Sequence, residues 1–141
     1  LQIPAYAAII DIIDIRYWHY QADGSAYAPM GGQSLAPRQH ARLLKPRKTS
    51  FEQVYRAVKE YRDKYPGKAV IYSGDSYPEF GIAAFMAGGS MAQLPAATAP
   101  ELLKAAAAMK PVKSGNAEEY LLSDGKRTIV YNTVTRKLEL K

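Results

Sequence analysis

The chain has 141 residues, a formal net charge of +6 and no cysteine. Its length suits one domain with a hydrophobic core or two small units, and the lack of cysteine excludes disulfides and thiolate metal sites. No apolar stretch approaches the roughly 20 residues that span a bilayer, and no signal peptide is visible. The chain begins without an initiator Met, so we expect a processed chain or a piece of a larger parent.

The first predicted element is a strand over residues 9–17. It opens as a nearly continuous β-branched run, typical of a parallel strand that is buried on both faces. Because side chains alternate along a strand, Asp14, Arg16 and Trp18 share one face near its carboxyl end. Parallel α/β proteins place their chemistry at that end. The alternative interpretation is an Asp14–Arg16 pair that satisfies its own charges beside a core Trp18.

A long loop, residues 21–48, follows this strand and contains Gly and Pro breakers throughout. Structureless loops longer than about 12–15 residues are often functional. Residues 38–48 hold five Lys or Arg together with His40 and no acid. Such a basic run favours nucleic acid or acidic glycans, whereas the alternative is a solvated loop in a basic protein.

An amphipathic helix is predicted over residues 50–65. Ser50 and Gln53 form a capping box, and apolar residues follow at helical spacing. Residues 69–73 predict a second short buried strand. The run is therefore a βαβ unit with parallel strands and a crossover helix. Residues 80–94 are apolar nearly all round and predict a buried helix.

The composition changes near residue 98. A capping box that begins at Thr98 predicts a further helix, which Pro111 stops. Residues 117–141 then predict an antiparallel β-meander. Its strongest local signal is Asp124-Gly125, which predicts a tight hairpin turn.

A family resemblance is carried by two segments, DIIDIRYWHYQADGSAYAPMGGQSLAPRQH and TSFEQVYRAVKEYRDKYPGKAVIYSGDSYPEFGIAAFMAGGSMAQLP. They resemble the last part of the barrel in a group of predicted secreted bacterial glycoside hydrolases of the apiosidase-like kind. Those proteins carry a small collagen-binding-type β-domain after a (β/α)8 barrel. The resemblance implies an α/β fold in which residues 1–97 are the last two βα units of such a barrel. Residues 98–116 would be a helix and linker, and residues 117–141 an incomplete small β-domain.

The resemblance also implies part of a glycoside hydrolase that acts on a polysaccharide or glycan. Isolated, the chain would be inactive, because the second catalytic carboxylate would come from an earlier strand. The family's nucleophile ends the penultimate strand and is usually Glu, but this chain has no Glu there. The candidate catalytic residues are Asp14, Asp75 and Glu79. The candidate substrate-binding residues are Arg16, Trp18, His19, Tyr20 and Tyr72.

We expect a glycan as partner, no cofactor, no metal and no membrane span. Neither His19 nor His40 has metal-ligand spacing, and no phosphate-binding loop is present. By resemblance the location is periplasmic or extracellular. Two βα units cannot close a barrel, so their edges would pair with the rest of the parent barrel or with another copy. The alternatives are a non-catalytic carbohydrate-binding or protein-interaction module and, less favoured, nucleic-acid binding through residues 38–48.

Overall fold

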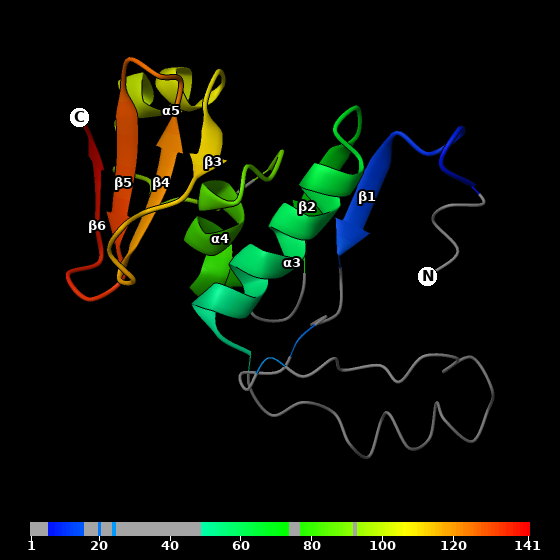
Figure 1. The fold of residues 1–141 in the computed structure, drawn as a ribbon, viewed down its shortest axis with the longest axis horizontal. Helices are drawn as coiled ribbons and strands as arrows, with labels where there is room; N and C mark the ends of the chain where they lie inside the picture. The colour runs from blue at the N-terminus through cyan, green and yellow to red at the C-terminus, as the bar shows by residue number, and fades with distance from the viewer. Residues whose placement is uncertain (1–5, 16–19, 21–23, 25–48, 74–76, 92) are drawn as a thin grey trace.

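The computed structural model describes residues 6–15, 20, 24, 49–73, 77–91 and 93–141, without the side chains of residues 77–79. These residues form a small mixed α/β domain with two separate sheets, one of two parallel strands and one of four antiparallel strands. Two of its helices, α3 (Phe51–Lys64) and α4 (Tyr77–Met86), lie between the sheets (Figure 1).

The parallel sheet pairs β1 (Ile12–Ile15) with β2 (Ala69–Tyr72), and Asp14 lies opposite Ile71. Helix α3 is the crossover between the two strands, so the predicted βαβ unit is confirmed. Its N-cap is Ser50, whose hydroxyl accepts a hydrogen bond from the Gln53 N–H at 3.3 Å. The capping box therefore located the start of this helix correctly.

The first strand is not buried on both faces, and that prediction is wrong. The side chains of Ile13 and Ile15 are buried, whereas Ile12, the first residue of β1, is 59% exposed. Helices α3 and α4 cover only the face that carries Ile13 and Ile15. Asp14 and Ile12 therefore lie on the opposite face, where burial is partial or absent.

Helix α4 is shorter than the predicted helix over residues 80–94. Gly88 adopts a φ of +77°, and its N–H donates to the Phe85 carbonyl at 2.9 Å. A left-handed residue with such a bond is a common helix terminus. Gly89 follows, and its N–H donates to the Ala84 carbonyl at 2.8 Å. The two glycines thus break the apolar stretch, and beyond them Met91 forms an isolated parallel bridge with Ile71.

The antiparallel sheet has the order β3-β4-β5-β6, and the predicted meander is confirmed. Its strands are β3 (Lys110–Val112), β4 (Glu119–Ser123), β5 (Thr128–Asn132) and β6 (Lys137–Leu140). The predicted tight turn is present: the Asp124 carboxylate accepts bonds from the N–H groups of Lys126 and Arg127, and Gly125 has a φ of +86°.

Two details before this meander differ from the prediction. Helix α5 (Pro100–Ala106) begins after Ala99 without a side-chain cap, because the Thr98 hydroxyl donates instead to the Pro95 carbonyl at 2.7 Å. Residues 110–112, expected as linker, form β3 and pair with β4. Pro111 is compatible with a strand because β3 is an edge strand.

The prediction of two barrel units is wrong. In a barrel, helices cover the outside of one closed sheet. Here α4 contacts β2 and also β4, so that one sheet lies on each side of it. One core joins β1, β2, α3 and α4, and a second core joins α4, α5, β4 and β5. The chain is therefore a small domain with helices between two sheets.

Candidate functional site

Asp14 lies where the sequence placed chemistry, at the carboxyl end of β1. It is half-buried, and its carboxylate accepts a 2.5 Å hydrogen bond from the hydroxyl of Ser73, which directly follows β2. The bond ties together the ends of the two parallel strands. Tyr72 faces the other way: it is 2% exposed and belongs to the core.

The remaining members of the predicted site lie outside the described residues. This applies to Arg16, Trp18, His19, Asp75 and the side chain of Glu79. The proposed common face of Asp14, Arg16 and Trp18 thus stays a prediction. Within the ranges that the structure describes, no group of three His, Asp or Glu residues could hold a metal ion.

Tyr20, the other predicted substrate-binding residue, reaches helix α3. Its hydroxyl donates to Glu60 Oε2 at 2.6 Å, and the Arg56 guanidinium lies 3.9 Å from the centre of its ring. Arg56 Nε also donates to Glu60 Oε1 at 2.9 Å. The hydrogen bond to Glu60 and partial burial raise the pKa of Tyr20. Arg56 and Glu60 are thereby held in one arrangement on the exposed side of the helix.

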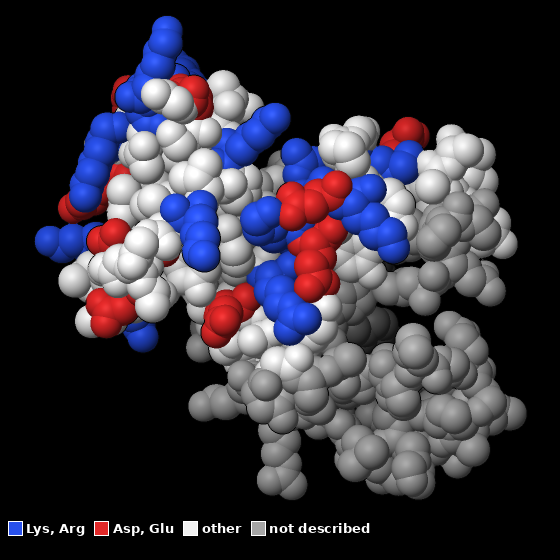
Figure 2. Space-filling view, viewed as in Figure 1, with Lys and Arg blue, Asp and Glu red and all other residues white. Residues whose placement is uncertain are grey.

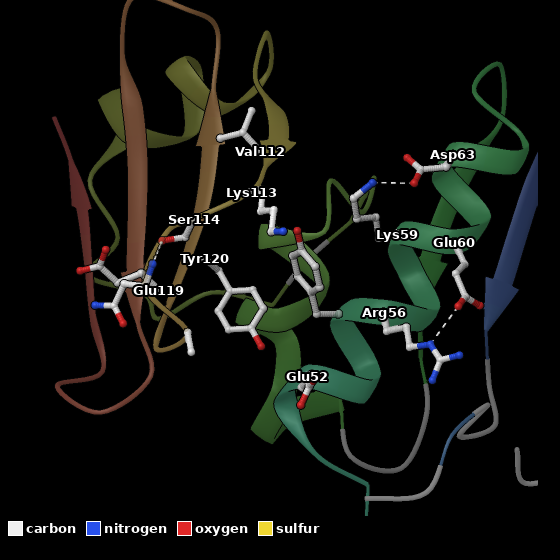
Figure 3. Close-up of a pocket in the computed structure, with 13 residues that line it drawn as sticks. Glu52, Arg56, Lys59, Glu60, Asp63, Val112, Lys113, Ser114, Glu119 and Tyr120 are labelled. Atoms are coloured by element: carbon white, nitrogen blue, oxygen red, sulfur yellow. Dashed lines mark hydrogen bonds and ion pairs between the residues drawn. The ribbon is translucent and has the colours of Figure 1, made fainter. Parts of the chain in front are cut away.

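An open groove of about 520 Å³ runs along this same side of α3 (Figure 3). Its other wall is made by residues 112–120, which lead from β3 into β4. The α3 wall follows a single helical face, because its residues are three or four positions apart. These residues are Glu52, Tyr55, Arg56, Lys59, Glu60 and Asp63.

A pair of tyrosines joins the two walls. The rings of Tyr55 and Tyr120 meet edge to face with centroids 4.6 Å apart, and Phe51 packs on Tyr120 at 4.8 Å. Burial is the main cause that raises the pKa of both tyrosines. Both phenols are therefore protonated at neutral pH and can donate hydrogen bonds. Neither hydroxyl has a hydrogen-bond partner in the described part of the chain.

Charged side chains of both signs line the helical wall. Arg56 pairs with Glu60 at 2.9 Å and Lys59 pairs with Asp63 at 2.5 Å, both four positions apart. Figure 2 shows the resulting interleaved acids and bases over α3. On the opposite wall, Lys113 has no ion pair within the ranges that the structure describes. The groove thus combines aromatic rings, free hydroxyl donors and charged groups.

The wall opposite α3 is ordered by its own hydrogen bonds. The Asn116 N–H donates to the Ser114 hydroxyl at 3.0 Å, and the Asn116 side-chain oxygen accepts from the Glu118 N–H at 3.0 Å. The Glu118 carbonyl in turn accepts from the Thr133 N–H at 2.9 Å, after β5. These bonds fix the loop against the sheet, so the groove is preformed.

Sequence reasoning missed this groove. In the sequence, Tyr55 fits the apolar stripe of its helix and Tyr120 fits the start of a meander strand. One signal was present: charged residues recur beside Tyr55 along one helical face, from Glu52 to Asp63. No local sequence pattern, however, links that helical face to residues 112–120, which are distant in the chain.

The fold and the groove define a small mixed α/β domain with an aromatic, charged groove on its surface. A family model described as a domain of unknown function (DUF6298) matches residues 1–109, and the chain belongs to this family. No curated protein and no solved structure matches the chain. The family match includes α3 but ends before β3, so the second wall of the groove lies beyond it. None of the described helices is long and apolar enough to cross a bilayer.

Proposed function

We propose that this domain binds a glycan in the groove between α3 and residues 112–120. The observation that carries the proposal is the Tyr55–Tyr120 pair, whose hydroxyls are protonated and have no hydrogen-bond partner in the described chain. Ligand sites commonly combine aromatic surface with a few well-placed polar groups. Tyrosine supplies both, because its ring body is apolar and its tip is polar. The glycoside hydrolase resemblance points to the same class of ligand.

The groove has the properties that a sugar chain requires. It is open to solvent, so a sugar could enter it from the side without threading. The tyrosine rings offer apolar surface to the C–H faces of a sugar. Glu52 and Lys113 lie in the same groove (Figure 3) as an acceptor and a donor for hydroxyl groups, and Asn116 also lines it. None of this requires a catalytic step.

Calorimetric titration of the chain with a panel of neutral and acidic oligosaccharides tests the proposal. Tyr120→Phe keeps the ring that packs on Phe51 but removes the hydroxyl donor. We expect about a threefold to tenfold loss of affinity, the value of one hydrogen bond. Tyr61→Phe, on the same helix but outside the groove, is the matched control and should bind normally. A panel without any binder contradicts the proposal.

Glycan hydrolysis at the carboxyl ends of β1 and β2 is a second candidate. It is favoured by one observation, the 2.5 Å bond from the Ser73 hydroxyl to the half-buried Asp14 carboxylate. Such a bond stabilises the charged form of a carboxyl group, which a nucleophile or base requires. Glycosidases need a second carboxyl group, about 5–5.5 Å away in retaining enzymes and about 6.5–9.5 Å in inverting ones.

Asp14→Asn separates the two candidates. The amide keeps the shape of the side chain but cannot act as a nucleophile or base. In a longer protein that contains this domain and cleaves a glycan, the variant should lose cleavage and retain binding in the groove. Cleavage at an unchanged rate would remove Asp14 from the mechanism without affecting the binding proposal.

A further inference from the structure

The charge layout of the groove points to a particular kind of sugar. Two of its bases are already committed, because Arg56 is paired with Glu60 and Lys59 with Asp63. Lys113, from the opposite wall, has no ion pair in the described part of the chain. Figure 3 shows its side chain extending toward α3. An exposed ammonium group beside an aromatic pair is a ready partner for an anion.

The nearby acids do not neutralise Lys113. Side chains alternate along β4, so the Glu119 side chain lies on the face of the sheet opposite Tyr120 and extends away from α3 (Figure 3), although Glu119 also lines the groove. Glu52 lies toward the other end of the groove (Figure 3), and its charge adds to the effect of burial in raising the pKa of Tyr120. The groove thus has an acidic end at the start of α3 and a basic end at Lys113.

The charge of the whole chain acts in the same direction. A formal charge of +6 attracts anionic ligands over long range and repels cationic ones such as amino sugars. A neutral sugar would leave the Lys113 ammonium without an ionic partner. A sugar with one carboxylate per ring would supply that partner and could still donate a hydroxyl hydrogen bond to Glu52.

On the basis of the proposed glycan binding, we infer that the groove selects a carboxylated sugar, a uronate residue. Its carboxylate would pair with Lys113 and its ring would lie against the Tyr55–Tyr120 pair. The inference names the ligand class of the groove and assigns Lys113 as the residue that determines it. It does not depend on the Asp14 site.

The test uses a matched pair of ligands, tri-galacturonate and its methyl ester, which differ in charge but not in backbone. The full chain is titrated with each at about 150 mM salt, where long-range attraction is largely screened. We expect the acid to bind more tightly than the ester. Lys113→Gln should weaken binding of the acid about twofold to fivefold and leave the ester unchanged, the value of an exposed ion pair.

Lys126→Gln is the control, because this exposed lysine lies in the β4–β5 turn and carries the same charge change. Poly-glutamate is the second control. Three results would each overturn the inference. The acid and the ester could bind equally well, the two lysine variants could have equal effects, or poly-glutamate could bind in a way that depends on Lys113. Glycan binding with any of these results leaves the proposed function standing. If neither the uronate pair nor the neutral panel binds, the proposed function itself fails.

Discussion

Tyr20 and Glu60 are forty positions apart in the chain, and a 2.6 Å hydrogen bond joins the phenol of one to the carboxylate of the other. The bond attaches residue 20 to the exposed side of α3, next to the groove. Arg56 completes the arrangement, since it contacts the Tyr20 ring and the same carboxylate. The contact therefore connects Tyr20 with the proposed binding surface.

Tyr20→Phe should lower the free energy of unfolding by about 0.5–1 kcal/mol, because one hydrogen bond is lost while the ring under Arg56 remains. Chemical denaturation with urea measures the difference. Tyr6→Phe serves as the control, since Tyr6 is 49% exposed. If both variants unfold at the same urea concentration as the parent, the Tyr20–Glu60 bond contributes nothing to stability.

The raised pKa of Tyr61 predicts that the folded chain loses stability at high pH. Burial raises the pKa of Tyr61 from 10.0 to about 12 in the folded chain. The folded state therefore favours the neutral phenol, and this contribution is complete below pH 10 and disappears as the pH rises toward 12. Thermal unfolding across this range should show a falling melting temperature. Tyr61→Phe should flatten the fall, and a variant with an unchanged slope would contradict the assignment.

The lowered pKa of Asp124 predicts that the folded chain loses stability at low pH. The backbone N–H groups of Arg127 and Lys126 and the Arg127 side chain lower the pKa of Asp124 from 3.8 to about 2. The folded state favours the carboxylate, so its contribution is present above pH 3.8 and lost as the pH falls through 2. Asp124→Asn should remove this part of the acid dependence. NMR titration of the Asp124 carboxyl carbon provides a direct check, and a midpoint near 3.8 would refute the turn geometry.

Substitutions at Ile12 and Ile13 test whether only one face of the parallel sheet is buried. Ile13 is 6% exposed and packs in the core, whereas Ile12 is 59% exposed. Ile13→Ala should cost about 2–4 kcal/mol of unfolding free energy and Ile12→Ala less than about 1 kcal/mol. Equal losses at the two neighbours would mean that the open face of the sheet is covered in solution.

Local patterns in the sequence predicted the local parts of this fold. The Ser50 capping box, the apolar spacing of α3 and the Asp124-Gly125 turn each depend on residues close together in the chain. The prediction that residues 9–17 form a strand buried on both faces was wrong for a physical reason. A β-branched run indicates a strand, but its pattern does not reveal how many neighbours cover the strand. The barrel prediction came instead from the family resemblance, and the second sheet on the other side of α4 overturns it.

The candidate site was harder to predict, because its parts are distant in sequence. The loop at Asn116 reaches α3 only because β4 packs against α4 and α5. That docking turns Tyr55 and Tyr120, two residues of ordinary core type, into a shared aromatic surface. The substrate-binding role of Tyr20 stays a prediction. Its contact with Arg56 nevertheless places it beside the groove.

The most direct test of the glycan-binding proposal is an NMR titration of the isotope-labelled chain with the oligosaccharide panel. Amide shift changes report where a ligand lies, independently of its affinity. Binding in the groove predicts saturable changes confined to residues 52–63 of α3 and residues 112–120, with none at Lys126. Changes centred instead on Asp14 and Ser73, or no saturable change with any sugar, would contradict the proposal.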